Sequence, residues 1–192
     1  MYSMQKIIYT IFFAIIFSSL FSQNKKTEKH FEIKTNLLNL AAAGPSAGLE
    51  YFLKNKNSFM VSLASGHIDY ADFGGITRYK TATVELRNYS SYSSGVQLFF
   101  GPYLKNIQKK VTRQKYVVAG VIPIGRNRDF IGNGISAGMS AGMKIKIYDR
   151  LHLEFNTQLG YGRYYQMADG YNNFPSGNYF DTRMGLWLGF QF

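Results

Sequence analysis

Apolar and polar residues alternate with a period of two along most of this chain. In the clearest stretch, residues 134–147, every odd position is apolar and every even position is Ser, Gly or Lys. A period of two places the two sets of side chains on opposite faces of a β-strand. Strands of soluble proteins usually have about five or six residues. This longer run therefore predicts a strand that crosses a membrane and continues beyond it.

The same period predicts eight strands. They are expected at residues 31–38, 47–53, 59–68, 79–89, 96–104, 134–147, 151–161 and 181–192. No stretch repeats apolar residues at helical spacing for more than one turn, so no helix is predicted. Transmembrane barrels made of one chain have an even number of antiparallel strands. The predicted fold is an all-β, eight-stranded antiparallel up-and-down transmembrane β-barrel.

The connections between the strands support the count of eight. Long connections are expected at residues 39–46, 68–78, 106–131 and 165–180, and short turns alternate with them. Such barrels have short turns on the periplasmic side and longer loops outside. A ninth strand at residues 116–124 would break this alternation. Residues 106–131 are therefore treated as one long outer loop, which can include a hairpin extension above the membrane.

The first 23 residues have the pattern of a secretory signal peptide. Lys6 is their only charge, a largely apolar stretch follows it, and small residues stand near position 22. The apolar stretch is short for a segment that spans a bilayer. We therefore expect a signal peptide at residues 1–23 and a barrel domain at residues 24–192. An exported barrel of this kind is expected in the outer membrane of a Gram-negative bacterium.

The composition agrees with a strand-rich fold that is stabilised by its own packing. The chain of 192 residues has 15 Tyr, 16 Phe and 19 Gly but only 4 Pro, which favours strands with tight inner packing. The absence of cysteine excludes a lipid-anchored lipoprotein and a disulfide-stapled secreted domain. A chain of this length is expected to form one domain.

Charges of both signs lie at the inward positions of the predicted strands. An eight-stranded barrel has room inside for side chains rather than for a wide channel, and buried charges have to be paired. We therefore expect a lumen closed by ion pairs. The predicted network contains Lys34, Glu50, Glu85, Arg87, Lys144, Lys146, Glu154 and Arg183.

The net charge of +11 is partly concentrated in the predicted long outer loop. Its cations are Lys105, Lys109, Lys110, Arg113, Lys115, Arg126 and Arg128, which only Asp129 opposes. A basic patch commonly binds nucleic acid, but an exported protein meets the phosphates of lipopolysaccharide instead. The loop is therefore either a contact for lipopolysaccharide or a merely solvated segment, and no nucleic-acid partner is expected.

Two serine motifs and one histidine invite a catalytic interpretation. Residues 134–138 and 138–142 each place a Ser between two Gly residues, but a nucleophile elbow is a turn from a strand into a helix. Both motifs lie inside one predicted strand. His152 faces inward on the next strand, yet it lies at the opposite end from Ser136. The histidines are far apart and there is no cysteine, so we predict no catalytic residue, no metal site and no cofactor.

Several short motifs resemble one family of small bacterial outer-membrane barrels. They are Lys34-Thr35-Asn36-Leu37-Leu38, Gly44-Pro45, Gly48-Leu49-Glu50-Tyr51, Gly101-Pro102-Tyr103-Leu104, Leu153-Glu154-Phe155 and Leu159-Gly160-Tyr161-Gly162. The family is catalogued as domain of unknown function 3575. The resemblance implies a small barrel in the outer membrane and brings no activity with it. One departure is Trp187, which stands where insertion signals of outer-membrane barrels often have Gly.

The last predicted strand has apolar residues at alternate positions and ends in Phe190 and Phe192. Aromatic residues are suited to the membrane interface. The resemblance to outer-membrane barrels implies that the barrel assembly machinery recognises this terminal insertion strand.

Together these patterns predict an outer-membrane barrel of structural or surface-interaction type, surrounded by lipid and lipopolysaccharide. One alternative is a lipid-modifying enzyme on the same scaffold, which needs a Ser, a His and an acid in contact near the outer leaflet. The other is a soluble exported barrel that binds an apolar ligand, which needs the apolar residues of 135–147 inside. The oligomeric state is not predicted.

Overall fold

The computed structural model describes residues 31–41, 44–53, 56–70, 75–93, 95–112, 130–169, 173–174 and 177–192. The predicted signal peptide at residues 1–23 and the candidate ninth strand at residues 116–124 lie outside the described residues.

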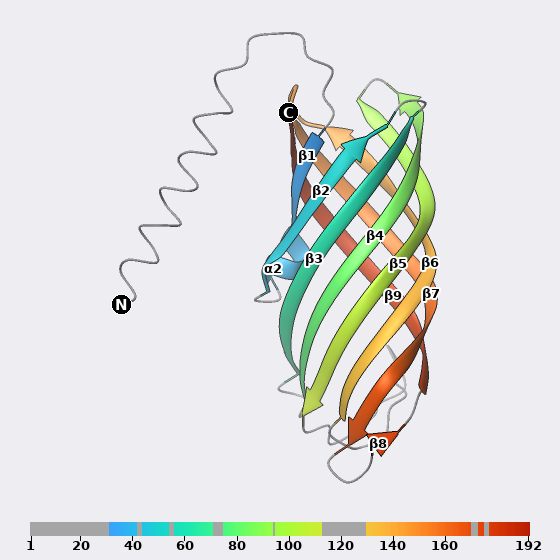
Figure 1. Ribbon diagram of the computed structural model, residues 1–192. Helices are drawn as coiled ribbons and strands as arrows, with labels where there is room; N and C mark the ends of the chain where they lie inside the picture. The colour runs from blue at the N-terminus through green and yellow to red at the C-terminus, as the bar shows by residue number, and fades with distance from the viewer. Residues whose placement is uncertain are drawn as a thin grey trace, which may run out of the picture. The chain divides into compact units, whose positions relative to one another are not determined.

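Eight antiparallel strands form a closed ring (Figure 1). They are β1 (Phe31–Asn36), β2 (Ser46–Phe52), β3 (Asn57–Tyr70), β4 (Gly75–Ser93), β5 (Val96–Thr112), β6 (Phe130–Lys146), β7 (Leu151–Asp169) and β9 (Gly177–Gln191). Each of the eight pairs with the next along the chain, and β9 pairs back with β1 to close the ring. A two-residue strand, β8 (Asn173–Phe174), pairs with the end of β7. The prediction of an eight-stranded antiparallel barrel is confirmed.

Successive strands reverse direction, so their connections alternate between the two ends of the barrel. The turns from β2 to β3, from β4 to β5 and from β6 to β7 lie at one end, which is uppermost in Figure 1. Two of them use a residue in the left-handed region, Lys56 at φ 62° and Gly95 at φ 95°. Glycine adopts this conformation without steric cost, which suits it to such tight turns. The longest connection, between β5 and β6, belongs to the opposite end.

Several strands extend farther toward that opposite end than predicted. β3 continues to Tyr70 and β4 begins at Gly75, so most of the connection expected at residues 68–78 is strand. β5 likewise continues to Thr112, where the prediction ended at Leu104, and remains in register with β6. Backbone hydrogen bonds between strands form whether or not the outer face of the sheet contacts lipid. Outside a membrane the outward side chains can therefore be polar while the strands continue. The hydrophobic pattern therefore fades before the strands end.

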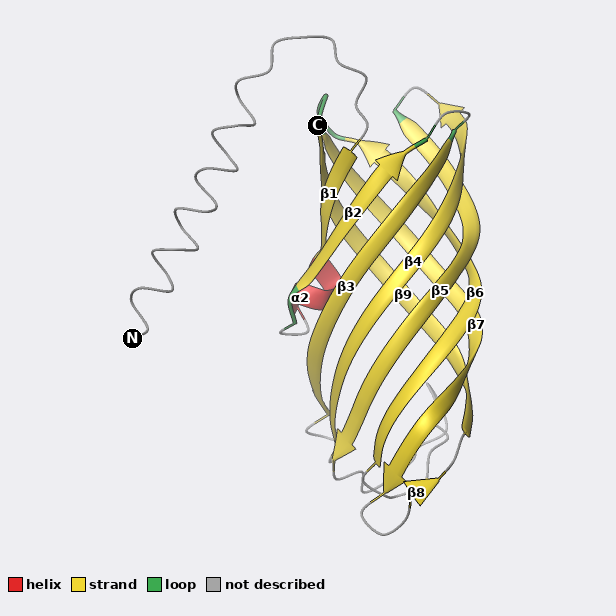
Figure 2. Cartoon of the chain, viewed as in Figure 1, coloured by secondary structure: helices red, strands yellow, loops and turns green. Residues whose placement is uncertain are grey.

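The first strand is shorter than predicted because a helix follows it. Helix α2 (Leu37–Ala41) is the red segment partway along the wall in Figure 2. The side-chain oxygen of Asn36 accepts a hydrogen bond from the backbone N–H of Asn39 at 3.2 Å, as in a helix N-cap. Five residues are too few for a helical period to show in the sequence. Among the described residues, no helix is long and apolar enough to cross a bilayer.

The side chain of Asn39 connects this helix to the neighbouring strands. Its amide nitrogen donates to the carbonyl oxygens of Gly44 and Ser65, both at 2.8 Å, and of Pro45 at 3.2 Å. Its oxygen accepts a hydrogen bond from the hydroxyl of Tyr79 at 2.5 Å. Asn39 is buried. Its amide supplies hydrogen bonds to backbone carbonyl groups that lie just beyond the start of the short β2.

Apolar side chains face outward and charged side chains face inward. Ile135, Met139 and Met143 are exposed, Met139 to 53%, whereas Ser140 and Lys144 on the same strand are buried. Leu153, Leu186 and Leu188 are half-buried and Phe155 is exposed on the same outer face. This facing is the inverse of a soluble barrel that encloses an apolar ligand. A continuous apolar exterior of this kind is what a surrounding of lipid stabilises.

Candidate functional site

Charged side chains meet inside the barrel at two levels. Nearer the short turns, β1, β2, β4, β6 and β7 contribute a group that we name the glutamate cluster. It consists of Glu32, Lys34, Glu50, Glu85, Arg87, Lys144, His152 and Glu154, all of them buried. Nearer the long connections, β5, β6 and β9 contribute the Asp181 cluster. It consists of Tyr103, Lys105, Ser136 and Asp181, which are also buried.

Lys34 is the centre of the glutamate cluster. Its Nζ lies 2.5 Å from a carboxylate oxygen of Glu50 and 3.9 Å from one of Glu32, and it also forms an ion pair with Glu154. The side chain of Lys34 is completely shielded from solvent. One ammonium group therefore compensates three carboxylates, two of which come from other strands.

Arg87 is the second cation of the cluster. Its guanidinium contacts Glu154 at 3.0 Å and Glu85 at 2.9 Å, and it lies 4.3 Å from the centre of the Phe99 ring. The planar guanidinium can contact two carboxylates along its edges and an aromatic ring on its face, and all three contacts stabilise its positive charge. Glu154 thus bridges the two cations, Lys34 and Arg87.

Lys144 is the third basic residue at the centre of the cluster. It pairs with Glu32, lies 3.5 Å from Glu50, and stands 4.5 Å from the centre of the Phe52 ring. Glu32 also has a histidine nearby, since Nδ1 of His152 lies 3.5 Å from its carboxylate. The cluster therefore holds four carboxylates against two lysines, one arginine and one histidine.

Neutral side chains supply further hydrogen bonds to the carboxylates. The hydroxyls of Tyr89, at 2.6 Å, and of Ser58 donate to Glu50. Gln158 donates to Glu85 at 2.6 Å, and the hydroxyl of Ser140 lies 3.2 Å from the same carboxylate. A buried carboxylate needs such partners because the charge has lost its water.

The Asp181 cluster is built around a single carboxylate. Lys105 lies 2.8 Å from it, and the hydroxyls of Tyr103 and Ser136 donate to it at 2.8 Å and 2.6 Å. Tyr103 and Lys105 come from β5, Ser136 from β6 and Asp181 from β9. Four polar side chains from three strands therefore converge on one point.

Between the clusters, Trp187 fills the lumen. The indole is 2% exposed, and its Nε1 donates to the side-chain oxygen of Asn156 at 3.2 Å. A Cβ on Gly185 would lie 2.5 Å from Nε1 of the indole, and one on Gly48 would lie 3.3 Å from its Cζ3. Small residues beside a large one are how a narrow barrel accommodates its interior. The glycine beside Trp187 is thus explained by the size of the indole.

Most of these ion pairs join strands that are not neighbours in the ring. Lys34 on β1 pairs with Glu154 on β7, Arg87 on β4 also reaches Glu154, and Lys144 on β6 reaches Glu32 on β1. The side chains therefore meet across the lumen instead of lining its wall. The charged groups of the cluster are therefore occupied with one another.

A family model for proteins of unknown function, DUF3575, matches residues 10–190. The chain belongs to the DUF3575 family. This matches the resemblance that the short motifs indicated, and the family description names no activity.

The DUF3575 barrel is also similar to solved structures at low sequence identity. Neisserial surface protein A is 13% identical, with a TM-score of 0.53 over 84% of this chain and 97% of that chain. The N-terminal β-barrel domain of Pseudomonas aeruginosa OprF is 12% identical, with a TM-score of 0.49 over 86% of this chain and 98% of that chain. At such identity the likeness establishes the fold alone. No curated protein sequence matches the chain.

Six of the eight residues predicted for the lumen network lie in the glutamate cluster of this DUF3575 barrel. Lys146 does not, because it is the last residue of β6 and its side chain is 47% exposed, 2.9 Å from Asp149. Lys146 belongs to the inward series of β6, but at the end of the strand its side chain reaches solvent. Arg183 does point inward, 5.9 Å from the centre of the Trp187 ring, but the described residues include no carboxylate paired with it.

Lys105 was assigned to the basic outer loop, and that assignment is wrong. It lies on β5, buried and paired with Asp181, because β5 continues past the predicted end at Leu104. Lys109 and Lys110 also lie on β5, Lys109 half-buried and Lys110 exposed. Arg113, Lys115, Arg126 and Arg128 lie outside the described residues.

Asp181, Tyr103 and Trp187 are inward residues that the sequence analysis left out of the network. Asp181 and Trp187 share the inward series of β9 with Arg183, so extending the period-two assignment to the whole strand would have included them. Tyr103 shares the inward series of β5 with Lys105 in the same way.

The structure does not bring Ser136 or Ser140 together with His152. Ser136 donates to Asp181 near the long connections, whereas His152 lies beside Glu32 near the short turns. Ser140 lies opposite Gln158 in the ladder. At ~3.3 Å per residue, that position is roughly 20 Å along β7 from His152. Neither serine is therefore within hydrogen-bonding distance of this histidine.

Proposed function

We propose that this DUF3575 barrel is an integral protein of the Gram-negative outer membrane that acts as a closed structural and surface-interaction scaffold. Its apolar exterior supports insertion in lipid. The observation that carries the proposal is the joining of Lys34, Arg87 and Lys144 to glutamates across the lumen. Side chains that meet across an eight-stranded barrel leave no wide channel. The short-turn end faces the periplasm and the long connections face outward.

A closed lumen predicts that the protein does not conduct ions. The full chain, purified in its folded state from outer membranes, is expected to give no steady current steps in a planar lipid bilayer. A water-filled path would need at least one of the crossing pairs to be absent. A porin measured in the same bilayer is the positive control. Reproducible conductance steps from the barrel would contradict the closed scaffold.

The end of β9 has a proposed role in assembly. Phe190 lies opposite Ile33 of β1 and Leu151 of β7, so it stands where the ring closes, and Phe192 follows it. Replacing both with alanine is expected to lower the amount of folded, heat-modifiable protein in outer-membrane fractions severalfold. Phe180→Ala is the matched control, because Phe180 lies at the other end of β9 and is 84% exposed. Equal amounts from both variants would contradict a role for this end in insertion.

We also infer that the partners of the scaffold are the lipids around it, above all lipopolysaccharide. Exposed cations of the DUF3575 barrel lie toward the end with the long connections, as Arg78 does on β4 and Lys110 on β5. Phosphates of lipopolysaccharide are the anions nearest to such residues in an outer membrane. This contact is the surface interaction that the scaffold offers.

A further inference from the structure

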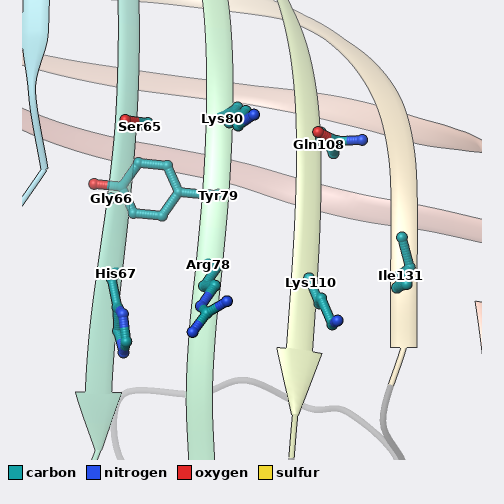
Figure 3. A pocket seen from close by; sticks show the side chains of 9 residues that line it. All are labelled: Ser65, Gly66, His67, Arg78, Tyr79, Lys80, Gln108, Lys110 and Ile131. Atoms are coloured by element: carbon teal, nitrogen blue, oxygen red, sulfur yellow. The ribbon is translucent and has the colours of Figure 1, made fainter. Parts of the chain in front are cut away.

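A group of basic residues lies on the outer wall of the barrel rather than in a loop. We name it the wall cluster, and it consists of His67 on β3, Arg78 and Lys80 on β4, and Lys110 on β5 (Figure 3). All four side chains are exposed. They occupy outward positions, since the residues between them on β4 and β5, Tyr79 and Lys109, belong to the inward series.

The strand register brings these basic residues side by side. His67 lies opposite Arg78, and Arg78 lies opposite Lys110 on its other side. Lys80 follows Arg78 at the next outward position of β4 and lies opposite Gln108. Figure 3 shows His67, Arg78 and Lys110 at one level of three neighbouring strands. Like charges directly opposite each other across a ladder are destabilising, so Arg78 and Lys110 repel each other unless an anion joins them.

Among the side chains that the structure describes, no carboxylate pairs with the lysines and the arginine of the wall cluster. The described ion pairs involve neither Arg78 nor Lys80 nor Lys110. The barrel thus pairs Lys34, Lys105 and Lys144 inside with carboxylates and leaves these outer cations without them. A cation row of this kind is suited to an anion that comes from outside the chain.

The wall cluster also lines a cavity. A hollow of about 440 Å³ lies among Ser65, His67, Arg78, Lys80, Gln108 and Lys110, with Ile131 at its border. A serine hydroxyl and a glutamine amide add neutral hydrogen-bonding groups to the cations. The hollow therefore combines positive charge, hydrogen-bond donors and an adjacent apolar residue.

The cluster begins directly where the apolar band of these strands ends. Leu63 lies opposite Ala82 on the outer face, and the next outward pair is Ser65 with Lys80. One step farther, His67 lies opposite Arg78. In the orientation proposed above, this is the level of the head groups of the outer leaflet. Lysine and arginine can extend their charged ends from an apolar wall to that level.

We propose that the wall cluster binds the phosphate of a phosphorylated lipid of the outer leaflet, namely the lipid A part of lipopolysaccharide. This inference rests on the proposed outer-membrane location and deepens it by naming the site. Guanidinium and ammonium groups bind phosphate through charge-assisted hydrogen bonds. The apolar band below, which includes Leu63 and Ala82, contacts the acyl chains of the same lipid. Free phosphate lacks that second contact, so the geometry favours the lipid.

The test compares two variants of the full chain with equal net charge. In the first, Arg78, Lys80 and Lys110 are each replaced by glutamine. In the second, which is the control, Lys56, Lys146 and Arg150 at the short-turn end are each replaced by glutamine. Native mass spectrometry of delipidated protein in detergent micelles then measures binding of bisphosphorylated lipid A and of dephosphorylated lipid A, and competition by inorganic phosphate.

The wild type and the control variant are expected to bind bisphosphorylated lipid A alike. Since one charge-assisted hydrogen bond corresponds to roughly tenfold in affinity, the wall-cluster variant is expected to bind it roughly tenfold or more weakly. Loss of the lipid phosphates is expected to weaken binding by wild type to a similar degree. Equal binding by both variants overturns the site, and equal binding of both lipids overturns the role of phosphate.

Competition by inorganic phosphate separates the two sources of the anion. If phosphate at the same concentration displaces lipid A fully, the proposal of a lipid site is overturned, whereas weak displacement supports it. The wall-cluster variant is expected to assemble in the outer membrane and to remain non-conducting, like the wild type. Conductance or absence from the outer membrane in the wild type would instead contradict the proposed scaffold, and this outcome is independent of the binding data.

Discussion

Replacing Lys34 with methionine is expected to lower the free energy of unfolding of the barrel by about 3–5 kcal/mol, the range for removing one partner of a buried ion pair. Lys34 contacts Glu32, Glu50 and Glu154 and is completely shielded from solvent. The substitution fills the space but leaves these carboxylates with less positive charge. Urea unfolding in detergent micelles, followed by circular dichroism, measures the loss.

Two further variants make this result specific. Lys146→Met is the matched control, since Lys146 forms an exposed pair with Asp149 and such pairs contribute about 0–1 kcal/mol. Lys34→Met combined with Glu154→Gln removes one cation and one carboxylate together. This double variant is expected to lose less than the sum of the two single losses, because the residues are directly coupled. A Lys34→Met protein as stable as the Lys146→Met protein would show that the glutamate cluster does not stabilise the fold.

Replacing Trp187 with alanine is also expected to cost about 3–5 kcal/mol, the usual range for removing a large buried aromatic side chain. The indole is 2% exposed, and the described contacts around it include the glycines at 48 and 185. Those glycines carry no side chain that could move into the space. The same urea titration measures the loss of stability.

The matched control for the indole is Phe155→Ala. Phe155 faces outward and is 47% exposed, so in the membrane lipid can occupy the space that its ring leaves. Its loss is therefore expected to be clearly smaller than that of Trp187→Ala. Equal losses of stability would mean that the neighbours of Trp187 move into the space that the indole leaves as readily as lipid enters the space that the Phe155 ring leaves.

The sequence predicted the barrel because one physical constraint repeats along every membrane-crossing strand. Lipid outside and packed polar groups inside impose a period of two, which is complete in residues 134–147 and identified Lys144 and Glu154 as inward. Outside the membrane this constraint weakens. Lys105 was therefore taken as a loop residue, although the ladder of β5 with β6 continues past it.

Other features could not be predicted because they depend on contacts between distant segments. Helix α2 has five residues, and its position depends on hydrogen bonds from Asn39 to Ser65 and from Tyr79 to Asn39. The wall cluster likewise exists only through register, which places Arg78 beside both His67 and Lys110. The sequence predicts His67 near the end of a strand, Arg78 in one connection and Lys110 in another, so nothing in the sequence joins them.

The short first hairpin has a mechanical consequence for the barrel. β1 has 6 residues and β2 has 7, whereas β3 to β7 and β9 have between 14 and 19. The backbone hydrogen bonds of β1 and β2 therefore cover only part of the height of the wall. Helix α2 and the side-chain hydrogen bonds of Asn39 join the chain to the wall beyond them. Two neighbouring strands separate most easily where the fewest backbone hydrogen bonds join them. The two junctions of β1, with β2 over four residue pairs and with β9 over five, are thus where this cylinder is easiest to open. The second of them is also where the first and last strands meet to close it.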